Sequence, residues 1–409
     1  MLRAGVHHAR LGHQPAKETM PLPAPDAVAL AQSAALIRHI SSAIAQAGGW
    51  IGFNRFMELA LYTPGLGYYS GGAHKFGEAG DFVTAPGLTS SFGQTLAAQA
   101  RQILTLSAPA IIEVGAGSGS LAADLLSELE LQTALPDSYG ILELSGELRA
   151  RQQETLARRV PHLSHRVYWL ERLPEHFDGL VVANELLDAM PVHLVLWRDG
   201  ERCEEILERG VSVDGEGEFS WIDRPASGLL LQRARELATE CKIPVGYLSE
   251  VNLAAPAWAA EWARVLGRGA LLLVDYGFPQ HEYYHPQRDA GTLMCHYRHH
   301  SHAEPFYLPG LQDITAHVDF TAIAAAGCAA GLDFLGFTTQ CSFLLNCGLP
   351  EVLARTPCDN ALRYLPLAQA AQKLISPAEM GELFKVIALG KGIDETLLGF
   401  SRGDRSATL

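Results

Sequence analysis

The chain has 409 residues, of which 48% are hydrophobic and 19% charged, a composition typical of a folded globular protein with one large domain or two. The formal net charge of −14 argues against a nucleic-acid partner, because phosphate binding depends on clustered Lys and Arg, and no apolar run approaches the ~20 residues of a membrane span. Seven cysteines without a C-x-x-C pair predict reduced thiols in a cytoplasm.

The N-terminal third is predicted to be mainly helical. Residues 1–27 lack both periodicity and an apolar core of secretory length, so we expect a disordered leader there. Apolar residues at helical spacing then predict helices over 27–48, 53–62 and 90–106. The segment 76–86 between them sets small residues and acids between two aromatics, which is typical of a loop that lines a site or of a surface turn.

A glycine-rich loop organises the chain. Apolar residues around Glu113 lead into glycine at every second position, and a helical pattern follows over 121–129. The glycines are Gly115, Gly117 and Gly119. A dinucleotide fingerprint would need Gly or Ala at Ser120, whereas the acid-x-G-x-G-x-G pattern of S-adenosylmethionine (SAM) sites is complete. The missing side chains let backbone approach the methionine end of SAM, and the acid can meet its ammonium group.

A second acid follows at a suitable spacing. A strand is predicted over 139–144, with Glu143 near its end, 24 residues beyond Gly119. In doubly wound folds an acid at this place accepts hydrogen bonds from ribose hydroxyls; the alternative is a solvated or helix-capping Glu. A polar helix over 146–159 and a short strand over 167–170 come next.

The next buried strand, predicted over 179–183, leads directly into Asn184 and two further polar residues. If a helix begins at Asn184, Glu185 and Asp188 stand at i and i+3 on one face. Two carboxylates at the carboxyl end of a central strand would be costly if dry and unpaired. We therefore expect them either to face water or to bind a cation.

The remaining chain alternates strands and helices. We expect hairpins over 193–221, helices over 227–241, 256–266 and 316–330, strands over 270–277, 333–339 and 383–389, a loop over 278–312 and a helical insertion over 350–378. This order predicts an α/β fold of the class I methyltransferase (Rossmann-like) type. It is a doubly wound sheet with a final antiparallel pair, an N-terminal helical segment, and helical and hairpin insertions in the C-terminal half.

The predicted organisation has five parts. They are a disordered leader (1–27), a helical segment with a cofactor-covering loop (28–106), a SAM-binding core with a hairpin insertion (107–277), a part that completes the sheet and carries substrate-side insertions (278–393), and a tail (394–409). A His-rich stretch over 281–302 lacks the Cys or carboxylate spacing of a zinc site, so we expect no metal.

Several separated motifs together resemble the MidA-type family of SAM-dependent methyltransferases, which includes the mitochondrial complex I assembly methyltransferase. The resemblance runs from about residue 50 to 390. It rests on Thr63-Pro64, Gly67-Tyr68-Tyr69, Phe76-Gly77, Gly80-Asp81-Phe82, Thr84-Ala85-Pro86, Phe92-Gly93, Glu113 to Gly119, Asn184-Glu185, Asp188-Ala189, Asp275-Tyr276-Gly277, His317-Val318-Asp319-Phe320 and Leu383-Phe384-Lys385-Val386. The family usually has proline at Ala116 and aromatics at Leu186 and Leu187, so the walls of the substrate pocket differ here.

The resemblance implies SAM as methyl donor and a protein arginine as acceptor, in the cytoplasm or, in a eukaryote, the mitochondrion. It further implies that Gly80, Asp81 and Thr84 fold over the cofactor, with Asn184 beside it. Paired carboxylates can bind a guanidinium through several hydrogen bonds and orient one of its nitrogens. We therefore assign Glu185 and Asp188 to binding of the acceptor. Asn184 joins them on this side, and His317 is a weaker candidate.

Two other functions stay open. An NAD-dependent oxidoreductase on a Rossmann sheet is disfavoured by Ser120 and by the acid at Glu113. A non-catalytic assembly factor that binds SAM, or only a partner protein, on an inherited fold is the stronger rival.

Overall fold

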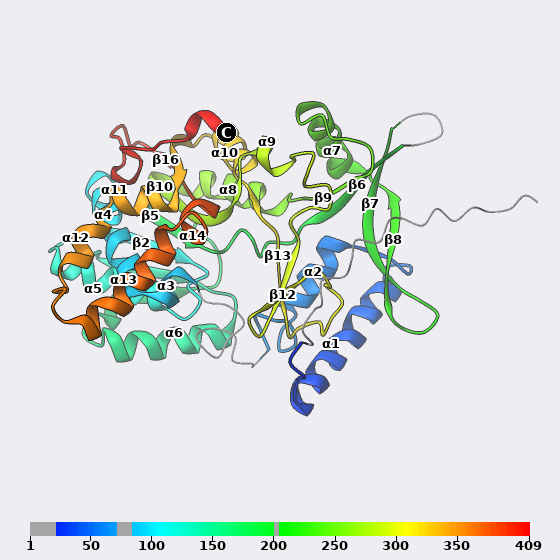
Figure 1. Ribbon diagram of the computed structural model, residues 1–409, viewed down its shortest axis with the longest axis horizontal. Helices are drawn as coiled ribbons and strands as arrows, with labels where there is room; N and C mark the ends of the chain where they lie inside the picture. Colours follow the sequence, from blue (N-terminus) through cyan, green and yellow to red (C-terminus); the bar gives the residue numbers. More distant parts are fainter. Residues whose placement is uncertain (1–21, 72–83, 200–203) are drawn as a thin grey trace, which may run out of the picture.

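The structure, a computed structural model, describes residues 22–71, 84–199 and 204–409 (Figure 1). The leader predicted over 1–27 falls mostly outside these ranges. A central sheet runs in the order β15-β16-β10-β5-β2-β3-β4. Its strands are β2 (Ala110–Val114), β3 (Ser138–Leu142), β4 (Val167–Leu170), β5 (Phe177–Asn184), β10 (Leu266–Phe278), β15 (Asp333–Thr339) and β16 (Phe384–Lys391), with β14 (Val318–Asp319) beside β10.

The strand directions confirm the predicted doubly wound sheet with a final antiparallel pair. Strands β10, β5, β2, β3 and β4 are parallel, whereas β16 runs antiparallel to both β10 and β15. Alternate residues of the buried strands enter opposite cores. In β5, Leu180 and Val182 contribute to one hydrophobic cluster and Val181 and Ala183 to the other.

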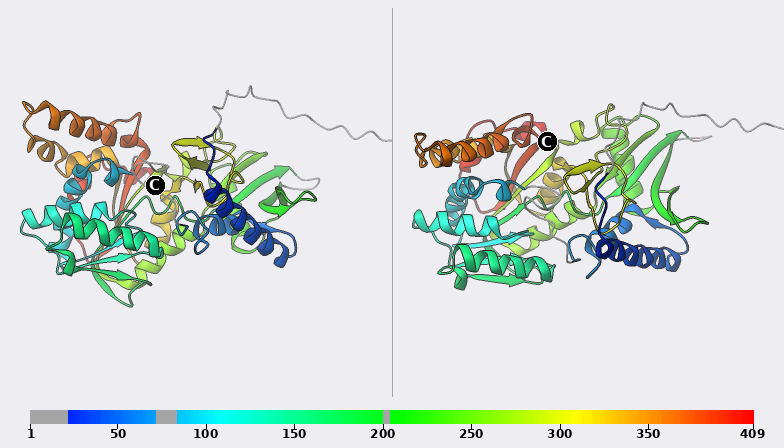
Figure 2. Two further views of the ribbon diagram at one scale, coloured as in Figure 1. Left: turned by 90° about the horizontal axis from the view of Figure 1, so that it is seen from below. Right: turned by 60° about the horizontal axis from the view of Figure 1, so that its bottom comes forward.

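Helices cover both faces of this sheet (Figure 2). The first face packs against α4 (Ser90–Leu106), α5 (Ser120–Leu131), α6 (Gly146–Arg159), α11 (Gln340–Asn346), α12 (Leu349–Ala354) and α13 (Ala361–Ile375). The second packs against α8 (Ala254–Val265) and α10 (Phe320–Ala329). Short elements α3 (Ala85–Leu88), α9 (Gln280–Tyr283), α14 (Met380–Leu383) and the 3₁₀ turns Ser164–Arg166, Leu398–Phe400 and Ser406–Thr408 complete these layers.

The N-terminal segment and the hairpin insertion share a second core. Strand β1 (Ile51–Gly52) pairs with β7 (Glu204–Val213) in a sheet ordered β1-β7-β6-β9, which also holds β6 (His193–Asp199), β8 (Phe219–Pro225) and β9 (Tyr247–Val251). Helices α1 (Ala27–Gln46) and α2 (Phe53–Tyr62) pack against it, and α7 (Gly228–Glu240) lies beside it (Figure 1). The core residues include Ile40, Phe56, Val192, Val211 and Ile314. Segments far apart in the sequence thus form one lobe beside the central sheet.

Helix α1 is long and apolar enough to cross a membrane, judged by length and composition, although no such run was expected from the sequence. The same test is passed by core helices of soluble proteins. Here Leu36, Ile40 and Ile44 of α1 are buried in the second core.

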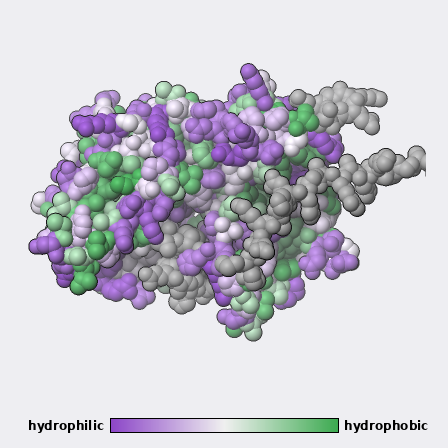
Figure 3. Space-filling model, in the orientation of Figure 1, coloured by the Kyte–Doolittle hydropathy of each residue, from purple (hydrophilic) through white to green (hydrophobic). Residues whose placement is uncertain are grey.

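Two predictions in the C-terminal half need correction. The region 278–312 is not only a loop, because β11 (Met294–Tyr297) and β12 (His300–His302) form a small sheet with β13 (Asp313–Thr315). The helix expected from 316 begins at Phe320, where the Asp319 carboxylate accepts the N–H of Ala322 at 3.1 Å. The helical insertion is confirmed, and its α13 exposes Leu362 and Leu365 on a face with apolar patches (Figure 3).

Candidate active site

A cleft of about 1280 Å³ opens at the carboxyl ends of β2, β3 and β5. Its lining comes from the glycine loop, the start of α6, the turn after β4, the segment after β5, and the end of α2 with the turn that follows. The polar and aromatic lining residues include Glu58, Tyr62, Tyr69, Thr84, Glu113, Glu143, Arg151, Arg158, Arg172, Asn184, Glu185 and Trp258.

The glycine loop requires glycine at each of its three positions. The backbone φ is +69° at Gly115, +51° at Gly117 and +79° at Gly119, a region that residues with side chains rarely adopt. A Cβ at Gly115 would lie 2.9 Å from Leu186 Cδ1, and one at Gly119 would lie 3.1 Å from Gln152 Cα. A Cβ at Gly117 would meet no atom within 4 Å, so there the backbone borders open space in the cleft.

Glu113, one residue before the end of β2, is a nearly buried carboxylate, 3% exposed, that still lines the cleft. Its Oε2 accepts the hydroxyl of Tyr139 at 2.7 Å. Burial raises the pKa of Glu113 to about 7, while the Tyr139 hydrogen bond acts in the opposite direction. A cationic ligand beside this carboxylate would favour its charged form.

Glu143 lies just past β3, which ends one residue before it. Its Oε1 accepts the N–H of Ser145 at 2.9 Å, and its Oε2 accepts Nε2 of Gln152 at 2.9 Å. The same Gln152 amide donates to the carbonyl of Gly117 at 3.1 Å, and its Oε1 accepts the indole N–H of Trp169 at 2.9 Å. Gln152 therefore ties the second acid to the glycine loop.

No helix begins at Asn184, the condition on which Glu185 and Asp188 would share a helix face. Glu185 instead adopts a φ of +50°, a strained value for a residue with a side chain, and its N–H donates to the carbonyl of Val274 at 2.9 Å. The reason is a distant carboxylate: Asp275 Oδ2 accepts the N–H groups of Leu186, Leu187 and Asp188 at 3.1, 2.8 and 3.3 Å. These bonds replace a helical pattern, so the argument from a shared helix face was wrong.

The turn places Glu185 in the cleft. Its Oε1 accepts the N–H of Ala85 at 3.3 Å and Nδ2 of Asn184 at 3.0 Å. Burial, and secondarily the charge of Asp188, raise the pKa of Glu185 to about 8. This carboxyl is therefore largely protonated at neutral pH until a cation binds beside it.

Asp188 lies deeper than Glu185. It is 6% exposed, and its side chain does not line the cleft. Its Oδ2 accepts the Tyr276 hydroxyl at 2.5 Å, and its Oδ1 is buried without a hydrogen-bond partner. Burial raises the pKa of both Asp188 and Asp275, which face each other through the turn.

The remaining predicted site residues have separate positions. Thr84 lines the cleft and accepts the N–H of Gly87 at 3.3 Å, whereas Gly80 and Asp81 lie outside the described residues. His317 does not line the cleft; its ring packs against Tyr276 with centroids 5.2 Å apart. Burial lowers the pKa of His317 to about 4, so its ring is neutral.

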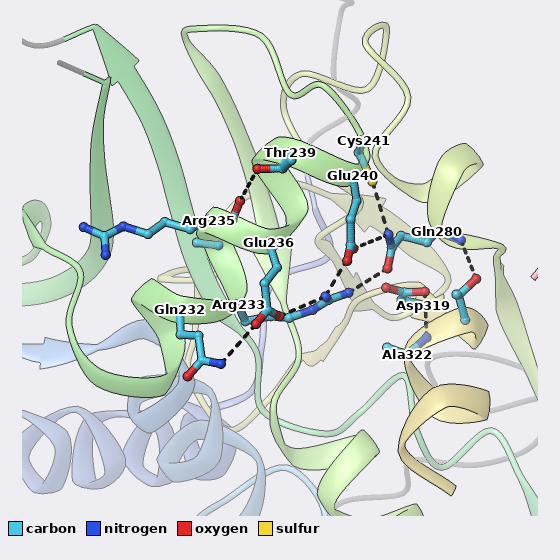
Figure 4. Close-up of polar contacts among 12 residues, drawn as sticks. Gln232, Arg233, Arg235, Glu236, Thr239, Glu240, Cys241, Gln280, Asp319 and Ala322 are labelled. Atoms are coloured by element: carbon cyan, nitrogen blue, oxygen red, sulfur yellow. Dashed lines mark hydrogen bonds and ion pairs between the residues drawn. The ribbon is translucent and has the colours of Figure 1, made fainter. Parts of the chain in front are cut away.

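Asp319, a further member of the His317 motif, belongs to a different junction. Arg233 of α7 donates to Glu236 and Glu240 at 3.3 Å and to Gln280 at 2.6 Å, with Asp319 close by (Figure 4). This network connects α7 with the start of α10. In the described part of the chain, no three His, Cys, Asp or Glu side chains converge as metal ligands.

Four of the residues that organise the site were not assigned as site residues from the sequence. Asp275 and Tyr276 belong to a recognised motif and follow a buried strand, which was an available signal. Gln152 and Tyr139 gave no such signal in the sequence, because each contributes through a hydrogen bond to an acid that only the fold brings close.

A strand order with one late antiparallel strand, a glycine loop and two acids at neighbouring strand ends define a SAM-dependent methyltransferase. The family model described as "Putative S-adenosyl-L-methionine-dependent methyltransferase" matches residues 92–338, more than half of the chain. The chain belongs to this family.

The relatives agree with this assignment. The protein named "Protein arginine methyltransferase NDUFAF7, mitochondrial" of Danio rerio is 29% identical over 385 residues, which span 87% of this chain and 86% of that protein. Its Drosophila melanogaster homolog is 27% identical, over 83% of this chain and 81% of that protein. A crystal structure of a COG1565 superfamily member from Burkholderia thailandensis, bound to S-adenosyl-homocysteine, is 53% identical with a TM-score of 0.91, covering 95% of this chain and all of that one.

Proposed function

We propose that this protein transfers a methyl group from SAM to arginine side chains of a protein acceptor. The observation that carries the proposal is Glu185, a carboxylate that lines the cleft at the end of β5 beside the glycine loop. Guanidinium is a planar cation whose N–H groups match a carboxylate in two-point contact. The names of the Danio rerio and Drosophila melanogaster relatives support arginine as the acceptor group.

The residues around the glycine loop fit SAM. Open space at Gly117 allows close backbone approach, and two carboxylates are available for the ammonium group and the ribose hydroxyls. We assign Glu113 to the ammonium, Glu143 to the ribose, and the glycine loop to the methionine end. When bound, SAM would supply the methyl group from its sulfonium. The proposed cofactor set is Glu113, Gly115, Gly117, Gly119, Glu143, Gly80, Asp81, Thr84 and Asn184.

On the acceptor side, Glu185 would bind the guanidinium and hold one nitrogen in line with the methyl carbon. As that nitrogen forms its new bond it must lose a proton, and the ionised Glu185 carboxylate that hydrogen-bonds to the guanidinium is placed to accept it. Asp188 and His317 are not in the cleft, so we assign them to positioning. Both contact Tyr276, while Asp275 fixes the turn that presents Glu185.

The acidic character of the chain fits a cationic acceptor and no nucleic acid. We further propose that the protein works in a reducing compartment, either the cytoplasm or, in a eukaryotic cell, the mitochondrion. The six cysteines in the described part are free, and the two relatives above are named as mitochondrial proteins or their homologs.

The test is transfer of labelled methyl from SAM to proteins in a lysate of a strain that lacks this protein. Acid hydrolysis of the labelled product should release methylarginine with wild-type protein and little with Glu185→Gln. Glu261→Gln on α8 is the matched control, because Glu261 does not line the cleft, is half exposed and is paired with Arg264 at 3.2 Å. Label on another amino acid would refute the arginine assignment, and SAM binding without transfer would indicate a non-catalytic factor.

A further inference from the structure

The wall of the cleft opposite the glycine loop carries two stacked tyrosines. Tyr62 ends α2 and Tyr69 follows the next turn; both line the cleft. Their ring centroids are 5.5 Å apart and the rings are inclined by 24°. Tyr68 packs edge-on against Tyr69 at 5.1 Å, which supports the pair from behind.

The hydroxyl groups of both rings are hydrogen-bonded. The Tyr62 hydroxyl donates to the carbonyl of Ala189 at 2.8 Å, in the same segment that presents Glu185. The Tyr69 hydroxyl donates to both oxygens of Asp313 at 3.0 Å. Burial and these acidic surroundings raise the pKa of both phenols far above neutral pH, so neither acts as an acid or base. The part of each side chain that is left to contact a ligand is therefore the aromatic ring.

The electrostatic setting of the pair is acidic. Asp313 and Asp188 both contribute to the raised pKa of Tyr62 and of Tyr69. The charged lining residues of this half of the cleft are the acids Glu58 and Glu185, whereas the half built by α6 and the turns after β3 and β4 mixes three arginines with four acids, namely Arg151, Arg158, Arg172, Glu143, Glu147, Glu154 and Glu171. A cation is therefore favoured at the tyrosine wall, and the electron-rich faces of aromatic rings attract cations.

We propose that the Tyr62–Tyr69 pair is the platform on which the planar guanidinium of the acceptor stacks. The inference rests on the proposed function and deepens it. Glu185 holds the edge of the guanidinium through hydrogen bonds, while the tyrosine rings hold its face. Together the two contacts select a flat cation over the tetrahedral ammonium of lysine.

The experiment measures binding of N-acetyl-arginine methylamide to the full chain saturated with S-adenosyl-homocysteine. Its neutral isostere, N-acetyl-citrulline methylamide, and the lysine analogue are measured in parallel. Tyr62→Leu and Tyr69→Leu remove the aromatic face, whereas Tyr62→Phe and Tyr69→Phe keep the ring and lose only the hydroxyl. Tyr364→Leu on α13, which does not line the cleft, is the matched control.

The Leu variants should weaken arginine binding by roughly 2- to 30-fold, the range of cation–π contacts from exposed to desolvated sites. The Phe variants and the Tyr364 control should stay within about 2-fold, and affinity for S-adenosyl-homocysteine should be unchanged throughout. Leu variants that bind arginine as wild type does would overturn the platform alone. Wild-type protein that binds citrulline or lysine compounds as tightly as arginine would overturn the proposed acceptor as well.

Discussion

Replacing Glu185 by Gln should stabilise the protein at neutral pH while it abolishes most activity. The side chain keeps its shape, and its amide oxygen can still accept the N–H of Ala85 and Nδ2 of Asn184. What the variant removes is the proton that this carboxyl must take up on folding at neutral pH. In the wild type, burial and the neighbouring Asp188 raise the pKa of this carboxyl from 4.5 to about 8.

The raised pKa of Glu185 determines how the free energy of unfolding changes with pH. The folded protein binds the Glu185 proton more tightly than the unfolded chain does, so this contribution is complete below pH 4.5 and is lost as the pH rises to about 8. Each pKa unit corresponds to about 1.4 kcal/mol, so at pH 7 the loss is roughly 3 kcal/mol. Glu185→Gln avoids this loss, and titrating groups that do not interact with Glu185 cancel in the comparison of the two proteins.

Urea denaturation of both proteins at pH 5 and pH 7 measures the difference in the free energy of unfolding. Glu185→Gln should be more stable than wild type by roughly 1 kcal/mol at pH 5 and by roughly 3 kcal/mol at pH 7, whereas Glu261→Gln should show no such increase with pH. Methyl transfer by Glu185→Gln should fall roughly 10- to 150-fold, the cost of a lost charged hydrogen bond. A variant that is less stable than wild type at pH 7 would mean that the folded protein holds Glu185 ionised, and would refute the reasoning.

Three further changes test the cofactor half of the cleft by calorimetric titration with SAM. Gly119→Ala places a methyl group on a residue with left-handed backbone and against Gln152. The affinity for SAM should therefore fall at least about 10-fold, and the protein should unfold at a lower urea concentration. An unchanged affinity would show that Gly119 does not belong to the site. Gln152→Ala removes the amide that donates to Glu143, so the affinity for SAM should fall roughly 10-fold while the chain stays folded. An unchanged affinity would contradict this role of Gln152. Tyr139→Phe removes the bond that holds down the pKa of Glu113, so SAM binding should weaken at pH 7 and recover by pH 9; a pH-independent loss would contradict this.

The glycine loop could be read from the sequence because its requirement is local. Gly115, Gly117 and Gly119 each need a backbone conformation that a side chain would strain, and contiguous residues supply it. The parallel strands were predictable for a similar reason, since burial on both faces leaves continuous apolar runs such as 179–183.

The segment after β5 was mispredicted because its conformation is determined from a distance. Its residues have no strong preference against a helix, and the deciding contact is the carboxylate of Asp275, 87 to 89 residues further on, which accepts three consecutive N–H groups. Sequence spacing placed Glu185 and Asp188 on one surface, but the turn separates them into one residue that lines the cleft and one that is buried. Hydrogen bonds to a distant residue, rather than the local sequence pattern, thus determine the backbone conformation beside Glu185.

The cleft and the turn after β5 together hold acids whose charged forms are unfavourable. Burial raises the pKa of Glu113, Glu185, Asp188 and Asp275, and Glu185 also keeps a strained backbone. None of these features stabilises the fold, and a sequence selected for stability alone would replace them. Their cost is offset only when positive charge enters the cleft, which both a sulfonium donor and a guanidinium acceptor bring. The same acids therefore favour the two substrates of methyl transfer over its neutral product, S-adenosyl-homocysteine.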